Sequence, residues 1–206
     1  MKKIINAGKY DIIIEKNSLC SFGEYVKTSL GTTSAKLLIV SDDRVYSLYG
    51  DRTREALKSA GFTLAEDYVF PHGEMSKNLS NLGEILRHAA GEGLTRSDCI
   101  AALGGGVTGD MAGFAAAVYL RGIKYVSIPT SILAMVDSSV GGKTAVDIPE
   151  GKNLVGAFHE PSFVLSDTAL LSTLPEDFVS DGMAEVIKYG VLGNTALFSL
   201  LENSKS

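Results

Sequence analysis

Residues 99–110 read Cys-Ile-Ala-Ala-Leu-Gly-Gly-Gly-Val-Thr-Gly-Asp, and this stretch joins a buried-strand pattern to a cluster of glycines. The apolar run 99–103 has the length and composition of a strand that is covered on both faces. Small and apolar residues at helical spacing follow over 111–119. The stretch therefore predicts a strand–turn–helix unit of the kind that builds parallel sheets.

The rest of the chain repeats this alternation of strand and helix. Lys3 to Asn6 and Asp11 to Glu15 look like short strands that can form a hairpin across Gly8. Further strands are predicted at 36–41, 64–70, 125–128 and 163–165, and helices up to Gly61 and over 79–90. This order predicts an α/β fold with a Rossmann-like, doubly wound parallel sheet.

The texture of the sequence changes near residue 166. From Thr168 onward, apolar residues follow the spacing of successive short helices, without another clear strand. We therefore expect an α/β domain over residues 1–166 and the beginning of an all-helical second domain over residues 167–206. The second segment is small for an independent core.

Composition excludes several classes of protein. The 206 residues carry 19 Lys and Arg against 24 Asp and Glu, a net charge of −5, which argues against a nucleic-acid or membrane-surface partner. No apolar run reaches the length of a membrane-spanning helix, and the N-terminus lacks a signal-peptide pattern. We expect a cytoplasmic protein in which Cys20 and Cys99 are buried thiols.

The glycine cluster is a candidate phosphate-binding turn. Gly104, Gly106 and Gly109 match the spacing of the dinucleotide fingerprint, and backbone N–H groups at a helix start can bind pyrophosphate. The usual acidic residue about 20 positions later is missing, since position 124 is Lys, and Asp110 follows the cluster instead. A tight strand–helix turn without a ligand is the alternative.

Two other segments follow strands and would reach the same edge of the sheet. Asp42 ends the 36–41 strand, where a carboxylate can bind ribose or adenine, or can cap the next helix. Residues 73–77, Gly-Glu-Met-Ser-Lys, follow the 64–70 strand, and they predict either a ligand-binding loop or a capped helix start.

Two glycine–lysine pairs lie further along the chain. Gly142-Lys143-Thr144 is not a Walker A motif, because position 137 is Asp where that motif needs glycine. Lys143 and Lys152 are instead predicted to reach a small ligand from a loop, beside Asp137 and Asn153. Each lysine taken alone would be a solvated surface charge.

Glu185 and Lys188 lie three positions apart on a predicted helix, where a surface ion pair is the default expectation. A metal-binding role for Glu185 would require histidine partners. The chain has only His72, His88 and His159, and their spacing identifies no partner for Glu185.

Taken together, five motifs resemble the 3-dehydroquinate synthase family. They are Gly-Gly-Gly-Val-Thr-Gly-Asp (104–110), Pro-Thr-Ser (129–131), Val-Asp-Ser-Ser-Val-Gly-Gly-Lys-Thr (136–144), Gly-Lys-Asn-Leu-Val-Gly-Ala-Phe-His (151–159) and Ala-Glu-Val-Ile-Lys-Tyr-Gly (184–190). The resemblance extends from Asp42 through Lys188. These enzymes are sugar-phosphate cyclases with an N-terminal NAD-binding α/β domain and a helical C-terminal domain. They are usually dimers, so the full-length form is expected to be a homodimer.

The resemblance implies a phosphate lyase of the shikimate pathway. Its substrate would be a small phosphorylated sugar acid, 3-deoxy-arabino-heptulosonate 7-phosphate, and its products 3-dehydroquinate and phosphate. NAD would remove a hydride from C5 and return it within each turnover. A divalent metal, zinc or cobalt, would hold the hydroxyl that is oxidised.

The resemblance also assigns roles to residues. Those that resemble NAD contacts are Asp42, His72, Gly73, Glu74, Met75, Ser76, Lys77, Gly105, Gly106, Val107, Thr108, Gly109, Asp110, Thr130, Ser131, Lys143, Lys152, Leu170, Leu171, Ser172 and Thr173. Asp137, Lys143, Asn153 and Lys188 resemble substrate-binding residues, with Lys143 and Asn153 near the phosphate. Arg121 resembles an arginine that reaches the phosphate of the partner subunit, and Glu185 resembles the first metal ligand.

The sequence departs from the family at three places. Asp177 and Phe178 stand where Arg-Glu is common, and Ser131 stands where Thr is frequent. The family's two metal-binding histidines lie beyond Lys188, and residues 189–206 contain no histidine. We therefore expect negligible turnover by these 206 residues alone.

Two alternatives differ in the ligand that they require. A metal-dependent polyol dehydrogenase of the glycerol dehydrogenase type shares the glycine cluster, but its substrate has no phosphate for the lysine motifs to bind. A catalytically incomplete NAD-binding fragment would bind the cofactor without either activity.

Overall fold

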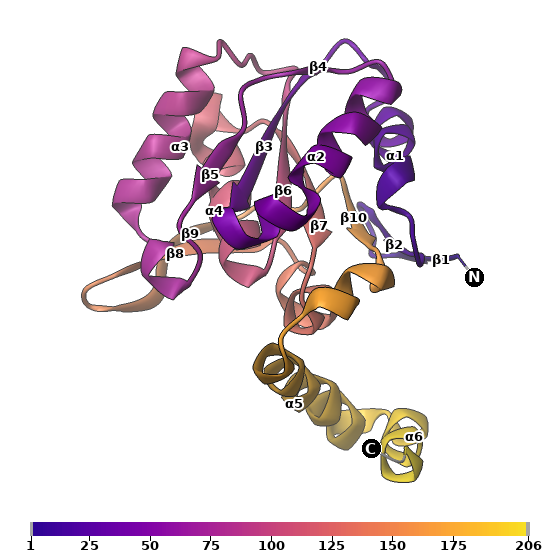
Figure 1. The fold of residues 1–206 in the computed structure, drawn as a ribbon. Helices are drawn as coiled ribbons and strands as arrows, with labels where there is room; N and C mark the ends of the chain where they lie inside the picture. The colour runs from indigo at the N-terminus through magenta and orange to yellow at the C-terminus, as the bar shows by residue number, and fades with distance from the viewer. Residues whose placement is uncertain (1, 205–206) are drawn as a thin grey trace.

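The protein is an α/β domain followed by two helices, as seen in a computed structural model that describes residues 2–204 (Figure 1). The main sheet has the strand order β1-β2-β10-β7-β6-β3-β4, and β5 also pairs with β3. Every pairing in this sheet is parallel except the hairpin β1–β2. The predicted doubly wound parallel sheet is therefore confirmed.

The elements have the following bounds. The strands are β1 Lys3–Asn6, β2 Asp11–Ile14, β3 Lys36–Asp42, β4 Thr63–Leu64, β5 Tyr68–Phe70, β6 Cys99–Gly104, β7 Lys124–Pro129, β8 Lys143–Ile148, β9 Gly151–Phe158 and β10 Phe163–Ser166. The α-helices are α1 Phe22–Leu30, α2 Asp43–Ser59, α3 Leu79–Gly91, α4 Gly106–Val118, α5 Glu176–Gly193 and α6 Thr195–Asn203. The shorter turns are η1 Leu19–Ser21, η2 Glu74–Ser76, η3 Tyr119–Arg121, the π-helical turn η4 Ala134–Ser138 and η5 Thr168–Thr173.

The core forms on both faces of the sheet because side chains alternate along each strand. In β3, Leu37 and Ile39 pack with α1 and α2, whereas Leu38 and Val40 pack with α3 and α4. The apolar runs read as continuous in sequence because both of their faces are covered. This three-layer arrangement leaves the carboxyl ends of β3, β6 and β7 at one edge, which Figure 1 shows at the bottom of the sheet.

Residues 143–158 correct the predicted loop around the two glycine–lysine pairs. They form β8 and β9, an antiparallel hairpin separate from the main sheet, with Lys143 opposite Phe158. Thr144 and Val146 are buried on the side of the hairpin that packs on the body of the domain. Lys143 and Lys152 therefore lie on strands, and both have exposed side chains.

Other predictions differ in detail from the structure. The single strand expected at 64–70 is two short strands, β4 and β5, that both pair with β3. Helix α1 was not predicted from the sequence. Helix α4 begins at Gly106, so the glycine cluster forms the first turn of α4. Cys99 is buried as expected, but Cys20 is exposed, so the prediction for Cys20 was wrong.

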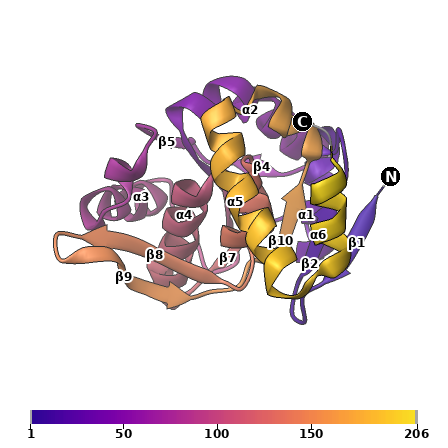
Figure 2. The same cartoon turned by 90° about the horizontal axis from the view of Figure 1, so that it is seen from below.

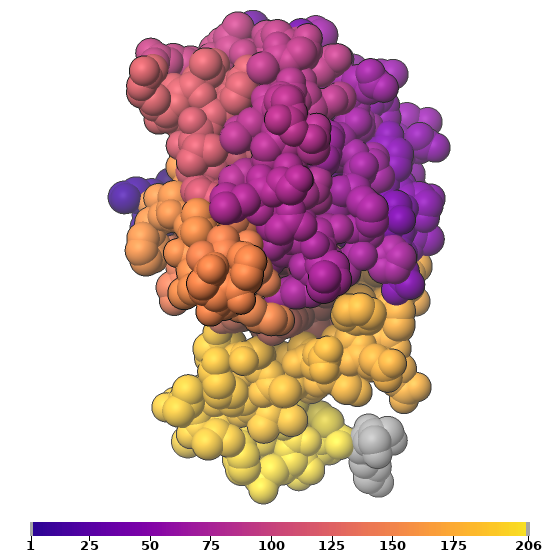
Figure 3. All heavy atoms as spheres, turned by 90° about the vertical axis from the view of Figure 1, so that its left-hand side faces the viewer, coloured from indigo at the N-terminus to yellow at the C-terminus, as the bar shows by residue number. Residues whose placement is uncertain are grey.

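Beyond β10 the described chain contains helices only. The expected short helices are instead η5, the 18-residue α5 and the 9-residue α6. Seen from below, α5 crosses the carboxyl edge of the sheet (Figure 2), and α5 and α6 protrude from the α/β body as a separate lobe (Figure 3). None of the helices described over residues 2–204 is both long and apolar enough to cross a membrane.

Candidate functional site

A cavity of about 560 Å³ opens at the carboxyl ends of β3, β6 and β7. Its floor is the first turn of α4, and its walls come from the start of α2, the turn η2, the segment after β7 and the start of α5. Open parallel sheets bind ligands at this position, because the loops after adjacent strands diverge there. The cavity contains most residues predicted to contact a cofactor. These are Asp42, His72, Gly73, Glu74, Lys77, Gly105, Gly106, Val107, Thr108, Asp110, Thr130 and Ser131.

The glycine cluster brings the backbone of α4 into contact with this cavity. Gly105 is the N-cap of α4 and provides no side chain, so the first N–H groups of the helix face the cavity uncovered. A Cβ on Gly106 would lie 3.1 Å from Oγ of Ser138. That hydroxyl is buried and lacks a hydrogen-bond partner among the described residues. The arrangement suits a pyrophosphate, since it offers N–H groups, a hydroxyl and a helix N-terminus together.

Asp42 fulfils the capping role that was one of its two predicted roles. One carboxylate oxygen accepts a hydrogen bond from N–H of Val45 at 2.9 Å, and the other accepts from Oγ1 of Thr108 at 3.4 Å. Asp42 therefore ties the start of α2 to the start of α4. Because its side chain also lines the cavity, its ribose-binding role stays a prediction.

The 72–77 segment lies along one wall and is held by ionic contacts. Nδ1 of His72 lies 2.7 Å from Oδ1 of Asp43, and this contact lowers the pKa of Asp43. Glu74 pairs with Nζ of Lys152 at 3.0 Å. The Met75 side chain is 91% exposed and does not line the cavity. Hydroxyl Oγ of Ser76 donates to the carbonyl of Pro71, which closes the turn.

Lys77 is the only lysine among the buried residues of the described chain, with 5% of its surface exposed. Its ammonium contacts Oδ2 of Asp110 at 2.5 Å and donates to Oδ1 of Asn153 at 2.5 Å. Burial raises the pKa of Asp110, although the Lys77 ammonium opposes that shift. The lysine thus connects η2, α4 and β9 in the wall of the cavity.

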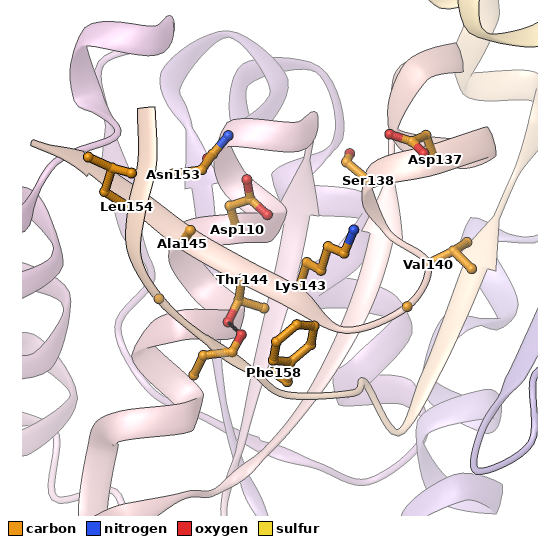
Figure 4. Close-up of a pocket in the computed structure, with 13 residues that line it drawn as sticks. Asp110, Asp137, Ser138, Val140, Lys143, Thr144, Ala145, Asn153, Leu154 and Phe158 are labelled. Atoms are coloured by element: carbon orange, nitrogen blue, oxygen red, sulfur yellow. Dashed lines mark hydrogen bonds between the residues drawn. The ribbon is translucent and has the colours of Figure 1, made fainter. Parts of the chain in front are cut away.

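A second cavity of about 620 Å³ lies between the hairpin and α4. It shares Asp110, Asp137, Ser138 and Asn153 with the first cavity, so the two cavities adjoin along these residues. Figure 4 shows the Lys143 ammonium directed into the space between Asp110 and Ser138, with Asp137 beyond it. The structure therefore brings together three of the predicted substrate-binding residues, namely Asp137, Lys143 and Asn153.

Asp137 has a further partner. Its Oδ1 accepts a hydrogen bond of 2.8 Å from the Tyr189 hydroxyl, which raises the pKa of Tyr189. This bond links the π-helical turn η4 to α5 across the cavity edge.

Several predicted site residues lie outside both cavities. The Tyr49 hydroxyl donates to the backbone carbonyl of Leu170 and also contacts Oγ1 of Thr173. Leu171 and Ser172 lie on the same turn, η5. Arg121 is exposed on η3, where its φ is +69°. The other predicted site residues that line neither cavity are Met75, Ser76, Gly109, Lys152, Glu185 and Lys188.

The cavities also contain residues that sequence reasoning missed. On the cofactor side these are Arg44, Val45, Leu133, Ser138, Pro175, Phe178 and Asp181. On the hairpin side they are Val140, Gly141, Thr144, Ala145, Leu154, Gly156, Ala157 and Phe158. Ser138 belongs to the quoted 136–144 motif, so its position beside Asp137 was the available signal. Pro175, Phe178 and Asp181 reach the cavity only through the fold of α5.

The metal site implied by the resemblance is not complete in the described residues. Residues 2–204 contain no cluster of three His, Cys, Asp or Glu side chains that could hold a metal ion. The Glu185 carboxylate contacts the ammonium of Lys188, as expected for an ion pair at this helical spacing, and the contact raises the pKa of Lys188. One carboxylate does not make a catalytic metal site, which typically has three protein ligands.

Comparison with known proteins identifies the family. The family described as 3-dehydroquinate synthase N-terminal matches residues 67–181, more than half of the chain. The chain belongs to the 3-dehydroquinate synthase family. A 3-dehydroquinate synthase from Picosynechococcus sp. is 49% identical over 199 residues, which are 96% of this chain and 53% of that protein. The chain thus spans about half the length of this relative.

Two solved structures extend the family relationship to the fold. A 2-deoxy-scyllo-inosose synthase complexed with carbaglucose-6-phosphate, NAD+ and Co2+ superposes with a TM-score of 0.81 at 32% identity. The superposition covers 91% of this chain and 50% of the 2-deoxy-scyllo-inosose synthase chain. A 2-epi-5-epi-valiolone synthase from Streptomyces hygroscopicus with NAD+ and Zn2+ gives a TM-score of 0.78 at 31% identity, over 90% of this chain and 50% of its own.

Proposed function

We propose that the chain provides the NAD-binding and phosphate-binding half of a 3-dehydroquinate synthase. In this proposal residues 1–166 are the NAD-binding domain, and residues 167–206 begin the helical domain. The observation that carries the proposal is the pair of adjoining cavities, which share four lining residues. One part presents a helix N-terminus suited to a dinucleotide, and the other presents a lysine and an asparagine suited to a phosphate.

In the cofactor half, the chain's own residues would bind and orient NAD. The pyrophosphate would lie on the N–H groups at the start of α4, with the Ser138 hydroxyl as an additional donor. Asp42, at the far end of β3, would accept from a ribose hydroxyl while it continues to cap α2. When bound, NAD would accept a hydride from the substrate and return it.

In the hairpin half, the residues would bind a phosphorylated sugar acid, 3-deoxy-arabino-heptulosonate 7-phosphate. Lys143 would pair with the phosphate, and its exposed ammonium is directed into the cavity (Figure 4). Asn153 would donate to a second phosphate oxygen, and Asp137 would accept from a sugar hydroxyl. The phosphate would leave by elimination before the carbocycle closes, so the Lys143 ammonium would favour both its binding and its departure.

The full-length protein would complete what the described residues lack. We expect a homodimer in which Arg121 reaches the partner's phosphate site, because this arginine is exposed and lines neither cavity of its own chain. Glu185 would be one ligand of a zinc or cobalt ion, and Lys188 would contact substrate. The remaining ligands of that ion would come from outside residues 2–204, which hold no complete set.

A chimera tests the proposal. Residues 1–206 replace the corresponding part of the Picosynechococcus enzyme, and phosphate release from the heptulosonate phosphate is measured with NAD and Zn2+ or Co2+. We expect turnover by the chimera, and negligible turnover by residues 1–206 alone. Lys143→Met in the chimera should lower kcat/KM by about 100-fold, as expected for the loss of a charged phosphate contact.

The controls separate the alternatives. Lys58→Met removes an exposed lysine near the end of α2, and it should leave kcat/KM unchanged. NADH production from glycerol without phosphate release would identify a polyol dehydrogenase instead. A folded chimera that binds NAD but has neither activity would contradict the proposed function and leave a binding fragment.

A further inference from the structure

Asn153 occupies an unusual position at the junction of the two cavities. Its backbone has φ of +57°, a left-handed conformation that asparagine adopts more readily than most residues. Its N–H donates to Oδ1 of Asp147 at 2.7 Å. In Figure 4 its side chain extends from β9 toward the space above Asp110. The tip of the hairpin therefore presents one amide group to the cavity.

The direction of that amide is fixed by Lys77. An ammonium group has three donors and no acceptor, so only the amide oxygen of Asn153 can face it. The contact from Nζ of Lys77 to Oδ1 of Asn153 is 2.5 Å. The other amide atom, Nδ2, then points away from Lys77, and it has no hydrogen-bond partner among the described residues. This nitrogen is a donor only.

Lys77 also holds the backbone around Asn153. The Lys77 carbonyl accepts from N–H of Asp147 at 2.9 Å, and Asn78 forms a bridge with Asp147. Asp147 in turn accepts from Asn153. The ammonium itself is held in place by Asp110, on the first turns of α4. Side-chain and main-chain contacts of one residue thus fix both the place and the orientation of the amide.

We propose that Lys77 is a positioning residue, which makes Asn153 a hydrogen-bond donor toward anionic oxygens in the hairpin cavity. This inference rests on the proposed function, because it defines how that site recognises phosphate. Without Lys77, the amide can turn and present its oxygen, which repels an anion. Lys77 would then act on the phosphate through Asn153 and not as a direct contact.

The first experiment tests the orientation without any ligand. The Asn153 side-chain amide resonance of the 15N-labelled chain is identified by its loss in Asn153→Ala. We expect Lys77→Met to shift that resonance, and Lys36→Met to leave it unchanged. Lys36 is the matched control, since its ammonium donates to the Glu92 carbonyl at 2.7 Å and lies outside both cavities. An Asn153 resonance that is insensitive to Lys77→Met would overturn the proposal.

The second experiment tests recognition by a double-mutant cycle. Inorganic phosphate is titrated into the NAD-loaded chain by calorimetry. Lys77→Met should weaken phosphate binding about tenfold when Asn153 is present, the loss of one charge-assisted hydrogen bond, and by less than about twofold in Asn153→Ala. An equal loss in both backgrounds would mean that Lys77 acts on the anion directly, which would overturn the inference.

A second variant guards against misfolding. Lys77→Met leaves the partly buried Asp110 carboxylate without its cation, whereas Lys77→Met with Asp110→Asn leaves no unpaired charge there. The double variant should show the same resonance shift and the same dependence on Asn153. Wild-type chain that does not bind phosphate would contradict the proposed function alone, because the resonance experiment would still decide whether Lys77 orients the amide.

Discussion

At the scale of single residues, a substitution of Gly105 should weaken cofactor binding while it changes the stability of the fold only slightly. A Cβ on Gly105 would lie 3.7 Å from Oγ of Ser131, an ordinary contact, and φ of −78° is open to any residue. Gly105→Ala should therefore cost at most about 1 kcal/mol of stability, the difference between Gly and Ala at an N-cap. The added methyl group lies where the pyrophosphate must approach the backbone, so NAD should bind at least about tenfold more weakly.

Calorimetric titration of NAD and thermal unfolding of the same variant measure these two effects. Gly83→Ala is the matched control, because nothing lies within 4 Å of a Cβ at that helical position. It should raise stability by about 0.5–1 kcal/mol and leave NAD affinity unchanged. Unchanged NAD affinity in Gly105→Ala would exclude close approach of the cofactor at this turn.

Single residues also mark the limit of what the sequence could predict. Asp137, Lys143 and Asn153 were predicted from one short stretch, and the structure places them around one space. The partly buried contact between Lys77 and Asn153 joins residues 76 positions apart. Their pairing depends on how the hairpin packs against α4 and the turn before α3, so no local pattern could reveal it.

At the scale of elements, the hairpin β8–β9 determines the shape of the phosphate-binding cavity. Ala145 lies opposite Gly156, and a Cβ on Gly156 would lie 2.1 Å from the Thr144 carbonyl oxygen. Because this carbonyl belongs to the backbone of β8, it cannot move away from the added Cβ unless β8 and β9 separate. Gly156→Val should destabilise the protein by about 1–3 kcal/mol, and the hairpin should account for most of the loss.

Hydrogen exchange of residues 143–158 measures whether Gly156→Val destabilises mainly the hairpin, and exchange in β6 is the internal reference. Exchange should accelerate in the hairpin and stay slow in β6 of Gly156→Val. Gly91→Ala is the control, because a Cβ at this position near the end of α3 has nothing within 4 Å. It should change the exchange rates of neither the hairpin nor β6. Equal acceleration in both elements would mean that the hairpin does not open as a separate unit.

The hairpin was missed in the sequence because two signals conflict there. Glycines at 141, 142, 151 and 156 are typical of loops, whereas Thr144 and Val146 alternate with more exposed residues as in a strand with one covered face. The central strands were easier to predict, since burial on both faces gives the continuous apolar run of β6. Short paired elements depend on tertiary contacts and carry a weaker local pattern.

At the scale of the whole molecule, the two C-terminal helices differ from the α/β body in how they are packed. In α5 only Gly182 and Gly190 are buried, and α6 has no buried residue among those described. Val191, Leu192 and Leu200 are 66%, 73% and 64% exposed. Segments with so little buried apolar surface open at a lower free energy than the core.

Amide exchange over residues 176–203 should therefore be at least roughly 100-fold faster than in β6. One close attachment is at Gly182, where a Cβ would lie 2.5 Å from Cβ of Ile132. Gly182→Leu should separate α5 from the body and accelerate exchange in α5 and α6 further, with no change in β6. Gly193→Ala meets nothing within 4 Å and serves as the control. Protection in α6 equal to that in β6 would show that the helices and the body unfold as one unit.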